Sequence, residues 1–194
     1  MELKKLEEFN HWWIEKNVDS ALALEFKRDV YSDMKKELNN RFIISISGLR
    51  RVGKTTLMYQ LIEDLLSRGV SLENVFFFSF DEVNVNFSEV IDSYREFQEK
   101  NFRKEKVYIF LDEIQKCDNW ENELKKYYDL YPKLKFIITG SESLFIKKKT
   151  KESLAGRVSE FVLKTFSFKE FLRFRGVSPS EFKYEKKIKP LFVK

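Results

Sequence analysis

Cysteine and long apolar runs are scarce in this sequence of 194 residues, and each scarcity excludes a class of protein. The single cysteine, Cys117, cannot form an internal disulfide, which excludes a disulfide framework and fits a reducing compartment. No apolar run reaches membrane-spanning length, and residues 1–10 lack the apolar stretch of a signal peptide. We therefore expect a cytoplasmic protein that makes no membrane contact.

Charge of one sign is not strongly in excess either. The chain has 36 basic and 31 acidic residues, mixed along its length, for a net charge of +5. Such a mixture is typical of a solvated surface and does not by itself indicate a nucleic-acid-binding protein. An apolar content of 43% and 20 phenylalanines predict a sizeable aromatic core. The length suits one domain, with room for the start of a second.

Residues 48–56 match the pattern G-x-x-x-x-G-K-[ST] at every position. A β-branched apolar run over residues 42–47 precedes them and predicts a buried strand. Apolar residues then recur at helical spacing from Leu57 to Leu66, until Gly69 ends the pattern. A strand, a glycine loop and a helix in this order predict a phosphate-binding loop. The alternative, a chance match in a strand-to-helix turn, is disfavoured by both flanks.

The residue types of this loop each have a chemical reason. Gly48 and Gly53 let the backbone aim its N–H groups at one centre, toward which the positive end of the following helix also points. We expect Lys54 to reach the β- and γ-phosphates of a nucleotide and the Thr55 hydroxyl to hold Mg²⁺. The sequence leaves open what Arg50 and Arg51 do. The expected nucleotide contacts are Gly48, Leu49, Arg50, Arg51, Val52, Gly53, Lys54, Thr55 and Thr56.

A second motif carries two adjacent carboxylates. Residues 107–111 predict a buried strand that runs directly into Asp112 and Glu113, which is a Walker B pattern. Asp112 is expected to bind Mg²⁺ beside the phosphate loop, and Glu113 to orient and polarise the attacking water. The alternative is an ordinary strand end. Glu113 favours hydrolysis over phosphoryl transfer to a small molecule.

Two further predicted strands end in polar residues. Residues 75–80 run into Asp81, which either faces the ligand or only forms the loop. Residues 134–138 run into Thr139, Gly140 and Ser141. A hydroxyl at this strand end would sense the γ-phosphate, and we prefer Ser141 to Thr139 for that role. A turn with no catalytic part is an equal alternative.

Residues 1–40 are expected to be helical before the first strand. Trp12 and Trp13 either stack on adenine or pack this extension onto the domain, and we favour packing because aromatic residues at helical spacing are usually core. The sequence leaves open whether Arg28 approaches the nucleotide. Lys147–Lys149 belong to the densest basic run, which we expect to be solvated, with nucleic-acid contact as the less favoured alternative.

Together these motifs resemble those of AAA-type P-loop ATPases, most closely the archaeal-type ATPase family. The matching stretches are residues 48–56, 110–115, 139–141, 154–157 and 166–171. The resemblance implies an α/β fold of the P-loop NTPase type, a three-layer sandwich whose parallel five-stranded sheet has the order 5-1-4-3-2. It also implies that Arg157 is an arginine finger, which completes the site of a neighbouring subunit in a homo-oligomer. A surface arginine is the alternative.

The resemblance also implies domain boundaries. We expect a helical extension over residues 1–27, the ATPase domain over 28–176, and a truncated lid or linker over 177–194. Relatives usually continue into a helical lid and a C-terminal domain, which would hold a protein or nucleic-acid partner. Lys164 and Thr165 stand where the family expects a proline.

The expected function is ATP binding and hydrolysis with Mg²⁺, which changes the conformation of a partner or appended domain. The alternative is a nucleotide-switched binding module with little hydrolysis of its own.

Overall fold

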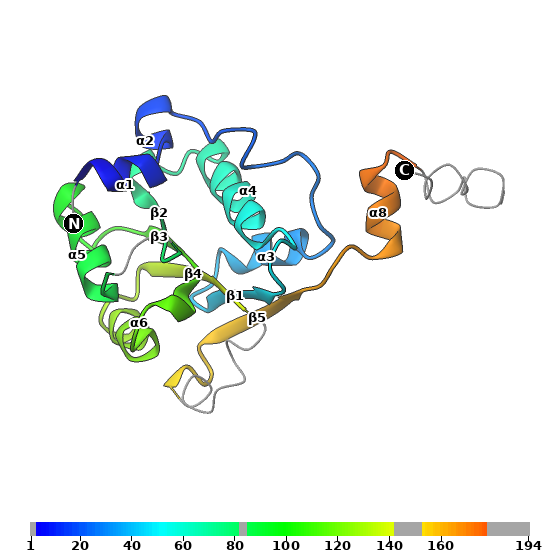
Figure 1. Cartoon of the computed structure of the whole chain (residues 1–194). Helices are drawn as coiled ribbons and strands as arrows, with labels where there is room; N and C mark the ends of the chain where they lie inside the picture. Colours follow the sequence, from blue (N-terminus) through cyan, green and yellow to red (C-terminus); the bar gives the residue numbers. More distant parts are fainter. Residues whose placement is uncertain (1–2, 82–84, 142–152, 178–194) are drawn as a thin grey trace. The chain divides into compact units, whose positions relative to one another are not determined.

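A computed structural model gives the structure of the chain and describes residues 3–81, 85–141 and 153–177 (Figure 1). The Lys147–Lys149 run and residues 178–194, for which the sequence made predictions, lie outside these ranges. The chain divides into two compact units, Met1–Leu163 and Lys164–Lys194. Within the second unit, helix α8 (Phe168–Phe174) begins with a capping box between Ser167 and Glu170.

The first unit contains one parallel sheet of five strands in the order β2-β3-β4-β1-β5. Read from β5, this is the predicted order 5-1-4-3-2, so the expected fold class is confirmed. The strands are β1 (Ile43–Gly48), β2 (Val75–Ser79), β3 (Val107–Asp112), β4 (Leu134–Gly140) and β5 (Val158–Leu163). Every residue of β1, β3 and β4 is buried, as expected for strands covered on both faces.

Helices cover both faces of the sheet and make three layers (Figure 1). One apolar cluster joins the sheet to α5 (Phe87–Phe97) and α6 (Trp120–Leu130). A second cluster joins the opposite face to α3 (Tyr31–Glu37) and α4 (Lys54–Ser67). Successive side chains of β2 point to opposite faces of the sheet: Phe76 and Phe78 belong to the first cluster and Phe77 to the second. Among the helices of the described residues, none is long and apolar enough to cross a bilayer.

The amino-terminal segment closes the free edge of β2. It contains two short helices, α1 (Leu3–Phe9) and α2 (Trp12–Glu15). The Asn10 side chain substitutes for a neighbouring strand: its amide donates to the Phe77 carbonyl at 2.9 Å and accepts from the Phe77 N–H at 2.7 Å. The Trp12 indole is fully buried and donates to the Val75 carbonyl at 3.2 Å. Packing, rather than adenine stacking, is therefore confirmed for Trp12.

The prediction of helix throughout residues 1–40 is wrong between α2 and α3. Residues 16–30 contain turns, bends and irregular backbone but no helix. The Gln60 side chain, from α4, donates to the main-chain carbonyls of Leu24 and Phe26. These tertiary bonds satisfy carbonyls that a local helix would otherwise use, so the apolar residues of the segment are anchored without helical periodicity.

Candidate nucleotide-binding site

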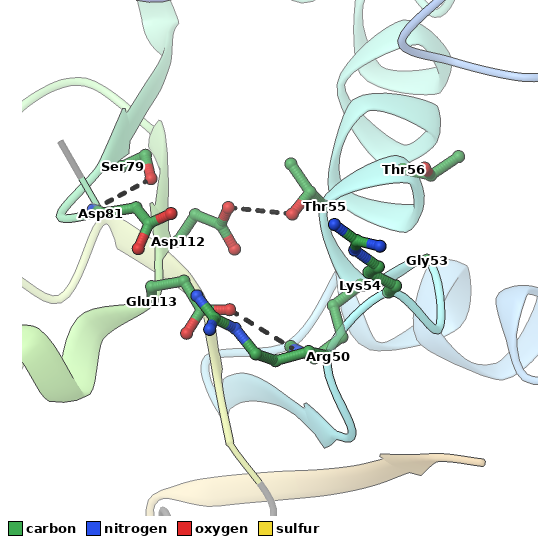
Figure 2. Close-up of a pocket in the computed structure, with 10 residues that line it drawn as sticks. Arg50, Gly53, Lys54, Thr55, Thr56, Ser79, Asp81, Asp112 and Glu113 are labelled. Atoms are coloured by element: carbon green, nitrogen blue, oxygen red, sulfur yellow. Dashed lines mark hydrogen bonds and ion pairs between the residues drawn. The ribbon is translucent and has the colours of Figure 1, made fainter. Parts of the chain in front are cut away.

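The carboxyl ends of β1, β2 and β3 open onto a cavity of about 750 Å³ (Figure 2). Open parallel sheets bind their ligands at this edge. The cavity contains both predicted motifs, the glycine loop after β1 and the two carboxylates at the end of β3. Its lining residues are Arg50, Arg51, Gly53, Lys54, Thr55, Thr56, Ser79, Asp81, Asp112 and Glu113.

The loop backbone has a shape that glycine makes possible. A Cβ atom on Gly48 would lie 2.3 Å from the Leu163 carbonyl oxygen, so no larger residue fits there. Gly53 has a φ of +96° and immediately precedes α4. No side chain among the described residues caps that helix start. The first N–H groups of α4 therefore remain available to an anion in the cavity.

Lys54 is the first residue of α4, and its side chain is only 5% exposed. Its ammonium donates to the carbonyl oxygens of Gly48 at 3.2 Å and Leu49 at 3.1 Å. The same nitrogen lies 3.6 Å from Oε1 of Glu113 (Figure 2). The amine thus stands between the glycine loop and the Walker B carboxylate.

Arg28 contacts the loop from the amino-terminal segment, a position that the sequence left open. It is buried, and its guanidinium donates to the Val52 carbonyl at 3.0 Å. A fixed cation therefore supports the backbone of the loop.

Asp112 and Thr55 lie side by side, which a shared Mg²⁺ site requires. The Thr55 hydroxyl donates to Oδ2 of Asp112 at 2.9 Å (Figure 2). The Thr139 hydroxyl donates to Oδ1 of the same carboxylate. Burial raises the pKa of Asp112, and the two hydroxyl bonds oppose that rise. Within the described residues no cluster of three or more His, Cys, Asp or Glu side chains could hold a metal. The donor set nevertheless fits Mg²⁺, which is usually held by one or two protein oxygens together with substrate phosphates and water.

Glu113 is held at both carboxylate oxygens. Oε1 faces Lys54, and Oε2 accepts a hydrogen bond from the Gln115 amide at 2.5 Å. Its backbone has a φ of +51°, which is uncommon for a residue with a side chain and typical of functional sites. Gln115 was not predicted as a site residue. Only the short 3₁₀ turn η2 (Ile114–Lys116) returns its amide to Glu113, and nothing in the sequence pattern signals that contact.

Thr139 connects the two Walker B residues. Its fully buried hydroxyl donates to Asp112 and accepts the Glu113 N–H at 3.0 Å. Ser141, the preferred candidate at this strand end, is half-buried one residue beyond β4 and is not among the described residues that line the cavity. Thr139, two residues earlier, contacts the Asp112 carboxylate and the Glu113 backbone.

Asp81 also lines the cavity, which was one of its two predicted roles. It forms an ion pair with Lys116. The hydrogen bond from Lys116 lowers the pKa of Asp81, and the charges of Lys116 and Arg50 lower it further. Figure 2 shows the Arg50 side chain extended toward the side of the cavity that holds Asp81 and Glu113. Arg50 is therefore a cavity cation, and Arg51 also lines the cavity.

Arg157 lies at the amino ends of the strands, opposite the cavity. It precedes β5, and its carbonyl accepts from the Ile43 N–H at 2.8 Å, whereas the glycine loop begins at the far end of this strand pair. The distance along β5 is roughly 17 Å at about 3.3 Å per residue. The guanidinium makes two hydrogen bonds to the Asp129 carboxylate, at 3.2 and 3.3 Å. Arg157 thus does not enter the cavity of its own chain.

Comparison with known proteins agrees with this geometry. A family model described as an AAA domain matches residues 40–172. An uncharacterized protein of Haemophilus influenzae is 29% identical over 141 residues, which cover 70% of this chain and 34% of the relative. The uncharacterized protein MJ1637 of Methanocaldococcus jannaschii is 31% identical over 157 residues, which cover 76% and 32%. The chain therefore spans about a third of the length of these curated relatives.

A solved structure titled "Structure of C. elegans PCH-2" is similar with a TM-score of 0.47 and 19% identity, over 87% of this chain and 49% of that one. The AAA family match extends from the residues before β1 into α8 and contains both the glycine loop and the Walker B carboxylates. The chain belongs to the AAA domain family, and this membership supports nucleotide binding of the ATPase type.

Proposed function

We propose that this chain hydrolyses ATP at the bond between the β- and γ-phosphates, with Mg²⁺ as cofactor. The observation that carries the proposal is the meeting of Lys54, the Thr55–Asp112 pair and Glu113 around one cavity. Phosphoryl transfer needs positioning and compensation of negative charge more than covalent chemistry, and these residue types supply both.

In this proposal Glu113 acts as the general base. The water oxygen forms a bond to the γ-phosphorus while the bond to the bridging oxygen breaks, and ADP leaves with that electron pair. The water proton passes to the Glu113 carboxylate. Lys54 neutralises phosphate charge, and because its ammonium now faces Glu113 at 3.6 Å, phosphate oxygens would compete with that carboxylate for it. Thr55 and Asp112 would hold Mg²⁺, which compensates further phosphate charge when it is bound.

Ser141 and Arg157 have proposed roles that depend on the γ-phosphate. We assign Ser141 to sensing this phosphate at the end of β4, while Thr139 links the Asp112 carboxylate to the Glu113 backbone. Arg157 would act on a neighbouring subunit, which fits its place at the edge of the sheet far from its own loop. To do so it would exchange Asp129 for a phosphate. Mass in solution with ATP and Mg²⁺ tests this role, and a strict monomer would exclude it.

We also propose that hydrolysis changes the conformation of a partner or an appended domain. The support is that the chain spans only about a third of its curated relatives. The boundaries proposed for the ATPase domain remain residues 28–176, with residues 1–27 as an extension.

The decisive experiment is steady-state ATP turnover with Mg²⁺, measured beside equilibrium ATP binding. The parent protein is expected to release phosphate, and Glu113→Gln to bind ATP with similar affinity without releasing it. Parent-like turnover by Glu113→Gln would show that the base is assigned to the wrong residue.

One observation favours a second function, a nucleotide-switched binding module. Both carboxylate oxygens of Glu113 already have partners, Lys54 and Gln115, which would compete with water for the base. Turnover should be measured with and without single-stranded DNA. If the parent is as slow as Glu113→Gln under both conditions while ATP still binds, the switch describes the protein better than the hydrolase.

A further inference from the structure

A second, smaller cavity of about 330 Å³ opens at the amino ends of β1, β3 and β4, the sheet edge opposite the nucleotide site. Three chain segments meet there: the turn after α3, the residue before β3 and the turn between α6 and β4. We call it the basic cavity. Its lining residues are Asn39, Asn40, Arg41, Lys106, Pro132, Lys133, Leu134 and Lys135, four of them cations and none of them acidic.

The four cations are held by neutral groups. Lys133 donates to the Lys104 carbonyl at 2.7 Å, and Arg41 donates to the Tyr128 carbonyl while its guanidinium lies 4.2 Å from the Tyr128 ring centroid. Lys106 lies 5.1 Å from the Tyr108 ring centroid. Within the described part of the chain, none of the four forms an ion pair.

This pattern differs from the rest of the described surface, where cations commonly contact carboxylates. Lys27 pairs with Glu63 at 3.3 Å, and Lys100 pairs with Glu105 at 3.3 Å. Even at the same sheet edge, Arg157 has Asp129. The basic cavity therefore concentrates positive charge that the described residues do not compensate, in a concave surface that a small anion can enter.

Lys135 makes the cavity more than a patch of exposed lysines. Lys135 is only 2% exposed. Its ammonium donates to Asn40 Oδ1 at 3.3 Å and to the Phe42 carbonyl. Two of its three protons are thus used, and both acceptors are uncharged. Burial without a contacting counter-charge is costly, and it lowers the pKa of Lys135 to about 8.

Asn40 fixes that ammonium in place. Its amide nitrogen donates to Glu37 Oε2 at 2.6 Å, so its oxygen must face Lys135 and the Phe42 N–H, which it accepts at 3.0 Å. The charge of Glu37 raises the pKa of Lys135, but Glu37 accepts hydrogen bonds from Asn40 and Ser159 rather than from the amine. The result is a preorganised cation at the base of a cavity whose rim is also cationic.

We propose that the basic cavity is a second phosphate-binding site, in which Lys135 contacts one phosphate group and Arg41, Lys106 and Lys133 surround it. The compound that carries the phosphate is either a phosphodiester of single-stranded nucleic acid or a free phosphate compound. The chemistry of recognition is the same for both: charge-assisted hydrogen bonds from amines and a guanidinium to phosphate oxygens. This site does not depend on the proposed hydrolysis, because it uses no residue of the nucleotide cavity.

The site is tested by titrating inorganic phosphate into the ¹⁵N-labelled 194-residue chain and following backbone amide signals by NMR. Saturable shifts are expected at Asn39, Asn40, Arg41, Lys133 and Lys135. The same titration of Lys54→Ala separates the two cavities, because shifts in the glycine loop should weaken while those at the basic cavity persist. Shifts confined to residues 48–56, or none that saturate, would overturn the proposal.

Variants identify the cations that matter. Lys135→Met keeps the length and apolar stem of the side chain, and the affinity for phosphate is expected to fall by about tenfold or more. Lys106→Ala/Lys133→Ala changes exposed residues alone and is expected to show a similar loss, so the test does not depend on a buried substitution. Lys126→Ala is the matched control, since Lys126 is an exposed lysine paired with Glu123. Parent-like affinity in both cavity variants would refute the site.

A fluorescein-labelled oligothymidylate then distinguishes the two sources of phosphate. Binding that inorganic phosphate displaces, with a slope of log Kd against log salt that decreases in Lys106→Ala/Lys133→Ala, identifies the phosphodiester as the ligand. Saturable phosphate binding without oligonucleotide binding identifies a free phosphate compound. Both results support the phosphate site.

Discussion

The two cavities, at opposite ends of the parallel strands, differ in whether their charged side chains contact groups of opposite charge. At the carboxyl edge each main ionic group contacts a group of complementary character: Lys54 faces Glu113, and Asp112 accepts from Thr55 and Thr139. At the amino edge, Arg41, Lys106, Lys133 and Lys135 contact carbonyls, an amide and aromatic rings.

The comparison teaches that a cation near a cavity has different consequences in these two settings. A site that contains both cations and carboxylates, as at the carboxyl edge, binds a nucleotide by exchanging internal contacts for contacts with phosphate and Mg²⁺. A uniformly basic cavity attracts an anion but, without one, leaves the cost of burying an amine uncompensated. Substitutions at the two edges should therefore give separable effects on turnover, on binding and on stability.

The largest effect is expected at the carboxyl edge from Glu113→Gln. An amide cannot accept the water proton, so turnover should fall by about 10²- to 10⁴-fold. ATP affinity should stay close to that of the parent, because the isosteric amide keeps the shape of the site. Phosphate release and nucleotide binding should be measured on the same preparation, and loss of both together would indicate a folding defect instead.

Lys54→Ala removes the cation that would bind phosphate at the carboxyl edge. We expect kcat/KM for ATP to fall by about 10²- to 10³-fold, by analogy with the loss of one preorganised donor to a developing negative charge. Calorimetric titration with ATP and Mg²⁺ measures the binding part of this loss. Lys126→Ala, which changes an exposed lysine of α6 that does not line the cavity, should behave as the parent. Equal losses in the two variants would mean that net charge, not the site, determines affinity.

The pH dependence of the free energy of unfolding tests Lys135 at the amino edge separately from the nucleotide cavity. The pKa of Lys135 is lowered to about 8, whereas an unfolded lysine has a pKa of about 10.4. Between these values the unfolded chain binds more protons, so the free energy of unfolding should rise with pH, by about 2 to 3 kcal/mol over the whole window. Below pH 8 the amine is protonated in both states, and this contribution no longer changes.

Denaturant unfolding of the parent and of Lys135→Met at several pH values between 7 and 10.4 measures the effect. The difference between the two proteins cancels other titrating groups, including Tyr31, whose pKa burial raises to about 12. A difference that is flat across this range would show that Lys135 is not a buried, uncompensated cation.

The smallest of these effects should come from Thr139→Val, which disturbs the pairing of the carboxyl edge without removing a charge. The variant leaves Asp112 Oδ1 and the Glu113 N–H without a buried partner, at a cost of about 1 to 3 kcal/mol in the free energy of unfolding. Thr139→Ser keeps the hydroxyl and should lose much less. Thermal unfolding ranks the two, and a loss in Thr139→Ser as large as that in Thr139→Val would show that the hydroxyl bonds do not explain the effect.

Much of the nucleotide site could be predicted from local sequence. The glycine loop and Asp112–Glu113 are contiguous motifs attached to strong strand patterns, and parallel strands bring their carboxyl ends to one edge. That Thr55 and Asp112 would meet followed from this topology, and the structure places them 2.9 Å apart. The assignment at the end of β4 was less certain, because two hydroxyls two residues apart cannot be ranked without knowing which one faces Asp112.

Contacts between distant segments could not be predicted in this way. Gln115 reaches Glu113 through a 3₁₀ turn, and Arg28 reaches Val52 from the non-helical segment to which Gln60 is hydrogen-bonded. Their sequences carry no periodic or motif signal, since each contact is determined by the packing of the partner segment.

The sequence by itself therefore determined the fold class, the phosphate loop and the identity of the two carboxylates, because these depend on short-range patterns. Tertiary structure decided that Thr139 links the Asp112 carboxylate to the Glu113 backbone, that Arg157 lies away from its own loop, and that four dispersed cations line one cavity. Lysines and arginines occur throughout this chain, and whether their charge is compensated depends on which carboxylates the fold places beside them. At the amino edge of the sheet, none of the residues lining the basic cavity is a carboxylate.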